Sequence, residues 1–149
     1  MEIDRLEVVA EVEAAFTAYE DALVRNDRDA ILAWFWDAEK TVRFGISDRQ
    51  HGADELRAWR AAQPPVPAGR RLTETTITTF GPDYAMVTTL FTYPSGAALG
   101  RQSQTWVRFP AGWRVVSAHV SELPVPAPGA LSPARVIMHR GPRAHSGGD

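Results

Sequence analysis

The chain has 149 residues, a hydrophobic content of 44% and a formal charge of -2. This length suggests one domain that can bury enough apolar surface to fold, and the balanced charge argues against a nucleic-acid partner, which calls for a basic patch. The absence of cysteine excludes disulfides, a thiol nucleophile and thiolate metal sites.

The N-terminus and the hydropathy pattern indicate neither a signal peptide nor a membrane span. Residues 1–4 are acidic and lack the apolar core of a signal peptide. No apolar run approaches the roughly 20 residues that cross a bilayer. We therefore expect a cytoplasmic protein with no membrane partner.

Two helices are predicted at the start of the chain. Apolar residues recur at steps of three or four over residues 3–23, which indicates an amphipathic helix that ends near Arg25. Asn26 and Asp27 are both typical caps of a following helix, which we expect to continue through Trp36.

A short strand and a third helix follow. Residues 41–44 read as a strand, and residues 53–62 read as a helix that ends before Pro64. Leu56 and Trp59 are the expected buried residues of this helix.

The segment up to Leu123 predicts long strands joined by tight turns, as in an antiparallel meander. Helices followed by a curved antiparallel sheet form an α+β fold. Such a cone closes at one end and stays open at the other, and its opening is a natural ligand site. The expected strands are residues 72–80, 84–93, 100–109 and 113–122.

Proline and glycine dominate the end of the chain. We take residues 1–123 as the folded domain and residues 124–149 as a Pro/Gly-rich tail. A mobile tail and an arm that packs on a partner subunit both fit this composition.

Tyr19 and Arg43 are the first candidate site residues. Tyr19 lies on the apolar stripe, so its ring should point inward and its hydroxyl needs a partner. Arg43 alternates with Val42 and Phe44, so it should face the side opposite to them. A core tyrosine and an exposed arginine would explain the same pattern. Inside a pocket, however, an arginine binds a carboxylate through two parallel hydrogen bonds.

The last two strands carry further candidates. With a tight turn at Ala111 and Gly112, Gln104 would pair with His119, and paired residues share a face. Composition does not decide which face of this hairpin lines the pocket. One predicted face carries Gln102, Gln104, Trp106, Ser117, His119 and Ser121, and the other carries Ser103, Thr105, Val107, Val116, Ala118 and Val120.

Several kinds of chemistry lack their motifs. The sequence has no Gly-rich phosphate loop and no Gly-x-Ser-x-Gly elbow. Its four histidines lack metal-ligand spacing, and no paired-carboxylate site is visible. We therefore expect no metal and no cofactor.

Five segments carry a resemblance to a known family. They are Thr-Val-Arg-Phe-Gly at 41–45, Trp-Arg-Ala-Ala at 59–62, Thr-Thr-Phe-Gly at 78–81, Gly-Arg-Gln-Ser-Gln-Thr-Trp-Val-Arg at 100–108 and Gly-Trp-Arg-Val-Val-Ser-Ala-His-Val-Ser at 112–121. On these residues the chain resembles the AtzH-like family, which includes HpxZ-type oxalurate catabolism proteins, within the NTF2-like (SnoaL-like) superfamily. The match covers about residues 5–123, and the run at 100–108 is its most specific part.

The resemblance implies an NTF2-like cone, with three N-terminal helices packed on a curved antiparallel sheet. It also implies a small amidohydrolase that acts on a carboxylated urea, as in cyanuric acid breakdown. The family's tyrosine of the first helix and arginine of the first strand match Tyr19 and Arg43. Arg43 would then bind the substrate carboxylate and Tyr19 would donate a proton. The remaining substrate-binding candidates are Gln104, Trp106, His119 and Ser121.

The family pattern often has an acidic residue and an amide after the first strand. Here that segment reads Ser-Asp-Arg-Gln at 47–50, and Arg49 departs from the pattern. This difference leaves the substrate open.

Two other functions fit the same sequence. A non-catalytic binding or accessory protein beside an amidase would use the same pocket without turnover. An isomerase of the SnoaL or ketosteroid isomerase kind would need a carboxylate or histidine base in the pocket. The resemblance also suggests a homodimer through the sheet, because Val107, Val116, Ala118 and Val120 would otherwise leave an apolar patch in water.

Overall fold

The computed structural model describes residues 1–124, and most of the predicted tail lies outside the described residues. The model confirms the α+β class: helices pack on one face of a curved six-stranded sheet. In chain order the elements are α1 (Leu6–Val24), α2 (Arg28–Ala33), β1 (Val42–Phe44), β2 (Arg49–His51), α3 (Ala53–Ala62), β3 (Arg71–Phe80), β4 (Tyr84–Thr92), β5 (Ala98–Phe109) and β6 (Gly112–Pro124).

The second helix is shorter than predicted. Asp27 caps it by accepting a hydrogen bond from the Ala30 amide at 3.1 Å. The helix ends at Ala33, because the next residues pair with the sheet instead. The Trp36 amide donates to the Val115 carbonyl at 2.9 Å, and the Val115 amide donates to the Trp34 carbonyl at 2.8 Å.

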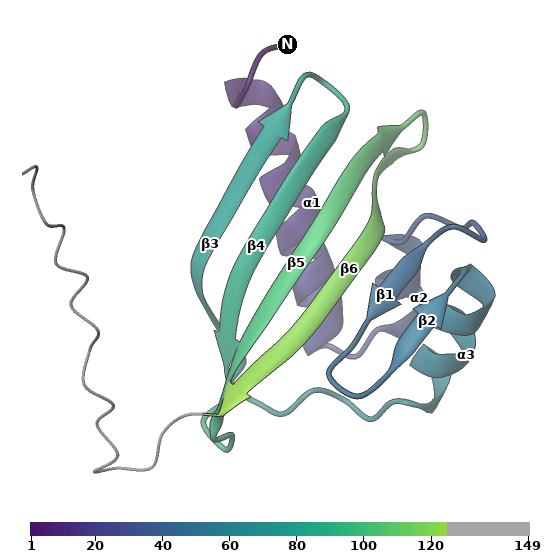
Figure 1. Ribbon diagram of the computed structural model, residues 1–149, viewed down its shortest axis with the longest axis vertical. Coiled ribbons are helices and arrows are strands. Elements are labelled where there is room, and N and C mark those ends of the chain that lie inside the picture. Colours follow the sequence, from purple (N-terminus) through teal and green to yellow (C-terminus); the bar gives the residue numbers. More distant parts are fainter. Residues whose placement is uncertain (125–149) are drawn as a thin grey trace, which may run out of the picture.

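The sheet has the strand order β2-β1-β6-β5-β4-β3. The β1–β6 pair is parallel, and the other neighbouring pairs are antiparallel. Figure 1 shows α1 crossing behind the long strands β3 to β6, while α2 and α3 lie beside β1 and β2. Strand β2 was not predicted, because its three residues are too few to show an alternating pattern.

The register between β5 and β6 differs from the prediction. Gln104 lies opposite Ala118, and His119 lies opposite Ser103. The predicted pairing of Gln104 with His119 is therefore wrong, for two reasons. The hairpin loop falls one residue earlier than expected, at Pro110 and Ala111, and the register shifts again next to Thr105.

This shift exchanges the faces of half of β6, because strand side chains alternate. Ala118 and Val120 lie on the concave face of the sheet, which α1 covers. Two of the four residues predicted to form an exposed apolar patch therefore point inward. Ser117, His119 and Ser121 lie on the outer, convex face, opposite to Gln102 and Gln104.

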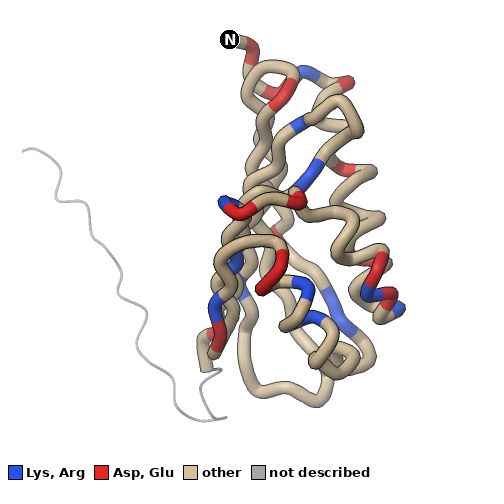
Figure 2. The backbone as a smooth tube through the Cα atoms, turned by 90° about the vertical axis from the view of Figure 1, so that its right-hand side faces the viewer, with Lys and Arg blue, Asp and Glu red and all other residues tan. Residues whose placement is uncertain are grey.

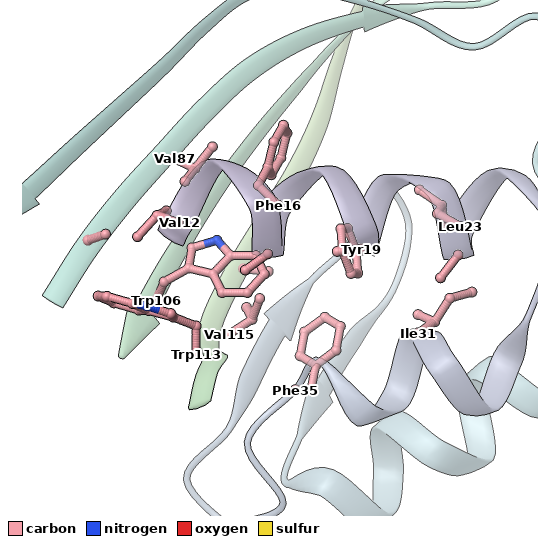
Figure 3. Packing of buried hydrophobic residues seen from close by; sticks show 14 of the residues in the cluster. Val12, Phe16, Tyr19, Leu23, Ile31, Phe35, Val87, Trp106, Trp113 and Val115 are labelled. Atoms are coloured by element: carbon pink, nitrogen blue, oxygen red, sulfur yellow. The ribbon is translucent and has the colours of Figure 1, made fainter. Parts of the chain in front are cut away.

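The core lies between α1 and the concave face of the sheet. Figure 3 shows Tyr19 of α1 pointing toward Phe35, with Trp106 beside it. The ring of Tyr19 makes edge contacts with Phe35 at 6.0 Å and with Trp106 at 6.4 Å between centroids. Such aromatic pairs contribute roughly 0.5–1.5 kcal/mol each beyond area burial, and they fix the tyrosine ring in one orientation.

Charged residues are spread over the backbone. Figure 2 shows acidic and basic positions interspersed along the described backbone. Among residues 1–124, no helix has the length and apolar character that crossing a membrane requires.

Candidate functional site

A cavity of about 510 Å³ lies at the end of the cone where the core stops. Side chains from α1, β1, α3 and β5 converge on it, together with the segment of residues 63–67 between α3 and β3. That segment reads Gln-Pro-Pro-Val-Pro and forms part of the rim. The polar residues that line the cavity include Tyr19, Arg43, Arg60, Arg70 and Gln102.

A second hollow of about 540 Å³ lies over α2, α3 and the β5–β6 turn. It contains none of the predicted site residues, and its floor includes the stacked rings of Trp36 and Phe109. We take the cavity beside Tyr19 as the candidate site because buried polar groups converge there, which is the mark of a binding site.

Tyr19 reaches the cavity from the apolar stripe of α1. The residue is 4% exposed, and its side chain lines the cavity wall. Within residues 1–124 the Tyr19 hydroxyl makes no side-chain hydrogen bond. By contrast, the Tyr93 hydroxyl accepts one from Arg70. Burial raises the pKa of the Tyr19 phenol, while the nearby positive charge of Arg60 opposes that rise. The phenol is therefore protonated at neutral pH and is a hydrogen-bond donor.

Arg43 lies on the inner face of β1, whereas strand alternation had predicted only that it faces away from Val42 and Phe44 and had left an exposed arginine open. Its side chain is 11% exposed, and its Nη1 donates to Asp48 Oδ1 at 2.7 Å and to Gln50 Oε1 at 3.1 Å. The Gln50 amide also donates to Asp48 at 2.8 Å. The acidic residue and the amide of the 47–50 segment thus act together: they fix and neutralise this guanidinium.

Gly45 makes room for that ion pair. A Cβ atom at this position would collide with the Asp48 carboxylate and with Nη1 of Arg43, 2.6 Å away. The glycine that follows β1 therefore leaves room for these two side-chain ends in their present positions.

A second buried cluster surrounds Arg70. Its Nε donates to Glu20 Oε2 at 2.9 Å, its Nη1 to the Tyr93 hydroxyl at 2.9 Å and its Nη2 to Gln102 Oε1 at 3.1 Å. The Gln102 amide donates back to Glu20 at 2.9 Å, and the Arg70 guanidinium lies 4.2 Å from the centroid of the Phe91 ring. Every side chain of this cluster has a partner within the protein.

Sequence reasoning missed Glu20 and Arg70. Glu20 was not among the predicted site residues, but it is only 8% exposed. Its position four residues after Phe16 and three before Leu23 is the signal that could have placed it on the buried side. No comparable local pattern marks Arg70, which precedes β3.

Arg60 of α3 has no such partner. The residue is 6% exposed, its Nε has no hydrogen-bond partner, and it takes part in no ion pair within residues 1–124. Its guanidinium carbon lies 4.6 Å from the ring centroid of Trp59, and that of Arg43 lies 4.0 Å from the same centroid. Burial lowers the pKa of Arg60, and the positive charge of Arg43 adds to this lowering, while the nearby Tyr19 and Asp48 groups oppose it.

Arg60 was also missed as a site residue. The prediction named Leu56 and Trp59 as the buried residues of this helix, whereas Leu56 and Arg60 are the ones classed as buried. These two residues are four apart and share a helix face, which was the available signal.

The four predicted substrate-binding residues do not line the cavity. Gln104 and Trp106 lie in the core behind it, where the indole Nε1 donates to Gln104 Oε1 at 3.1 Å. His119 is exposed on the convex face, and Ser121 of that face accepts a hydrogen bond from Arg101 at 3.1 Å. The register shift next to Thr105 is the reason why the two β6 residues point away.

Acid–base groups are scarce on the cavity wall. The one carboxylate among its described lining residues is that of Glu122, and no histidine is among them. Glu122 is exposed, so water surrounds its charge. Residues 1–124 also contain no group of three metal-ligating side chains.

Comparisons with known proteins identify relatives of this chain. The family model AtzH-like matches residues 1–125, whereas no curated protein matches. A cystatin-like fold protein from Burkholderia xenovorans LB400 is 51% identical, with a TM-score of 0.82 over 85% of this chain and 99% of that chain. A DUF3225 family protein from Pectobacterium atrosepticum SCRI1043 is 45% identical, with a TM-score of 0.79 over 81% and 94%.

A more distant structure shows the fold alone. It is an NTF2-like protein from Pseudomonas putida KT2440, which is 17% identical, with a TM-score of 0.65 over 78% of this chain and 87% of that chain. The predicted NTF2-like architecture is therefore confirmed, and the similarity carries no information on substrate.

Proposed function

The chain belongs to the AtzH-like family, and from this premise we propose that it is a small amidohydrolase whose cavity takes a carboxylated ureide. One observation carries the proposal: a protonated phenol, Tyr19, lines the same buried cavity as three arginines. A donor and fixed positive charges are what a polar substrate with a carboxylate and a carbonyl requires.

In the proposed reaction a water oxygen attacks the carbonyl carbon of the amide, and the C–N bond breaks. Tyr19 donates its proton to the leaving nitrogen, and the phenolate then recovers a proton from the attacking water. The net change converts one amide and one water into a carboxylate and an ammonium ion. The arginine charges stabilise the transient phenolate, since they already oppose the rise of the Tyr19 pKa.

Arg43 has a changed role in this proposal. The sequence predicted it as the carboxylate anchor, but its charge is compensated by Asp48 at 2.7 Å. Its remaining guanidinium donors can still hydrogen-bond the ligand and orient it against Trp59, 4.0 Å from the guanidinium carbon. We therefore assign Arg43 to orientation of the substrate.

The test is a screen of short ureido and carbamoyl carboxylates for ammonia release and for thermal stabilisation of the protein. For a hydrolysed compound, Tyr19→Phe should reduce turnover by about 10²–10⁴-fold, as removal of a general acid does, and should leave affinity nearly unchanged. Arg43→Ala should weaken binding.

Tyr84→Phe is the matched control, because Tyr84 is 39% exposed and does not line the cavity. It should behave like the parent. Turnover by Tyr19→Phe at the parental rate would remove this residue from the reaction.

A binding protein without catalysis is the second candidate, and one observation favours it. The single carboxylate among the described lining residues, Glu122, is exposed, so this described lining supplies no buried carboxylate or histidine base to activate water. In that case the same compounds stabilise the protein without releasing ammonia. The lack of a buried carboxylate or histidine base among the described lining residues argues more strongly against an isomerase, because isomerisation depends on such a base.

The homodimer through the sheet stays a prediction. Exposed apolar side chains on the convex face, among them Phe44 and Met86, support it. Light scattering coupled to size-exclusion chromatography measures the mass that decides it.

A further inference from the structure

We infer that Arg60 is the residue that neutralises the ligand, and that the cavity is built for a ligand with a single negative charge. The inference concerns binding in the cavity of the proposed function and names the charge class of its ligand. It requires no particular reaction.

The first argument is a count of charges. Three arginines and two carboxylates form the buried part of the site. Arg70 pairs with Glu20 at 2.9 Å and Arg43 pairs with Asp48 at 2.7 Å. The charge of Arg60 is left over. Glu122 lies on the cavity wall but is exposed, so water and salt screen its effect on the buried groups.

The second argument is the surroundings of Arg60. An isolated buried charge is costly, and proteins normally give it a partner of opposite charge. Here two weaker interactions replace that partner. Arg60 lies in the last turn of α3, where the helix dipole favours a cation, and its guanidinium carbon lies 4.6 Å from the centroid of the Trp59 ring. Both interactions are partial, so a full negative charge in the cavity would still be strongly favoured.

The third argument is the shape of the donor. Trp59 lies against the Arg60 guanidinium, while Nε has no hydrogen-bond partner in the described part of the chain. The N–H groups of a guanidinium lie in its plane and form a fork that matches the two oxygens of a carboxylate. A carboxylate therefore satisfies the orphaned Nε and the surplus charge with one group.

The same count sets an upper limit on ligand charge. A neutral ligand leaves Arg60 uncompensated, whereas a dianion brings a second negative charge for which the described cavity wall offers no further unpaired arginine, since Asp48 and Glu20 already pair with Arg43 and Arg70. We expect the cavity to prefer a monoanion to both.

Three related compounds test this order by isothermal titration calorimetry on the full chain. N-carbamoylglycine is the monoanion, its primary amide is the neutral analogue, and N-carbamoylaspartate is the dianion. The monoanion should bind about tenfold or more tightly than the amide, and the dianion should gain nothing over the monoanion. Tighter binding of the amide or the dianion, or no binding of the monoanion at millimolar concentration, would overturn the inference.

Substitutions of Arg60 assign the effect to this residue. Arg60→Met should weaken binding of N-carbamoylglycine by about 30-fold or more, and it should raise the melting temperature of the ligand-free protein because it removes an uncompensated buried charge. Arg60→Lys should restore part of the affinity. A residue that only supports the fold would lower the melting temperature when replaced.

Arg57→Met is the matched control on the same helix. Arg57 is exposed, with 54% of its side chain accessible, and pairs with Asp54 and Asp37. Its replacement should leave the affinity unchanged. If Arg60→Met fails to fold, Arg60→Gln serves in its place; parental affinity in either variant contradicts the inference.

The experiments distinguish failure of the proposed hydrolysis from failure of the inference on Arg60. Binding that depends on Arg60 without ammonia release would remove the hydrolysis and keep the inference. Ammonia release that persists in Arg60→Met with an unchanged KM would do the reverse.

Discussion

Two buried arginines line the same cavity, and their surroundings are opposite. Arg70 donates to Glu20, Gln102 and Tyr93, whereas Arg60 has an orphaned Nε and no ion pair within residues 1–124. Both lie against aromatic rings, at 4.2 Å for Arg70 over Phe91 and 4.6 Å for Arg60 over Trp59. The difference between them is therefore the presence of a carboxylate and not the type of neighbouring side chain.

This difference separates a structural charge from a functional one. A buried cation that is paired with a carboxylate joins α1 to the sheet and offers a ligand little uncompensated charge. A buried cation without an anion destabilises the folded chain until an anion arrives. Substitutions that act on one side of the cavity should consequently change stability, and those on the other side should change binding.

The largest expected effect is on the Arg70 side. Glu20→Gln removes the charge that neutralises Arg70, and breaking a buried pair in this way costs about 3–5 kcal/mol of unfolding free energy. Urea denaturation measures the loss. Glu13→Gln is the control, because Glu13 is exposed on the same helix, and its effect should stay within about 0.5 kcal/mol. Equal midpoints for the two variants would show that the Arg70 cluster does not support the fold.

A smaller loss of stability is expected at Gly100, next to the Arg70 cluster. A Cβ atom at Gly100 would overlap the ring of Phe91, on which Arg70 lies. Because an aromatic ring in a packed core cannot move freely, Gly100→Ala should cost about 1–3 kcal/mol of unfolding free energy.

Gly96→Ala is the comparison for this measurement, since its nearest neighbours would lie 3.6 and 3.7 Å from the new atom, an ordinary contact distance. A loss of stability as large as that of Gly100→Ala would point to backbone effects and away from the ring.

The smallest effect on stability is expected on the Arg43 side. The Cβ of Gly45→Ala would meet only the ends of the Asp48 and Arg43 side chains, which are flexible enough to move. Unfolding free energy should change by less than about 1 kcal/mol, but the displaced pair should weaken binding of N-carbamoylglycine roughly threefold, equivalent to about 0.7 kcal/mol.

Ser47→Ala in the same turn is exposed and should leave both quantities unchanged. If Gly45→Ala unfolded the protein instead, the Arg43–Asp48 pair would support the fold, as the Arg70–Glu20 pair does.

Local patterns predicted the elements of this fold well. The bounds of α3 agree with the prediction, because turn residues flank it on both sides. The inward position of Tyr19 was predicted from helical periodicity, and strand alternation placed Arg43 opposite Val42 and Phe44 without deciding whether it faces inward. In each case the signal lay within a few residues along the chain.

The errors came from interactions that a local pattern does not contain. A register shift in the last hairpin moved His119 and Ser121 to the convex face, and one extra residue is enough to invert every later side chain. The Arg70 cluster joins residues 50 and 82 positions apart in the chain, so no window could show it. The isolation of Arg60 is a property of the whole cavity, because it depends on where every carboxylate lies.

The rim of the cavity has a consequence for how a ligand enters. Three of the five residues in the segment 63–67 are prolines, and proline has no backbone N–H and a fixed φ angle. This part of the rim is thus stiff and has few backbone donors, so an incoming carboxylate meets few competing backbone N–H groups there before it reaches the guanidinium groups inside. Capture should then require little reorganisation of the entrance, and the residence time of the ligand, more than its rate of arrival, should distinguish good ligands from poor ones.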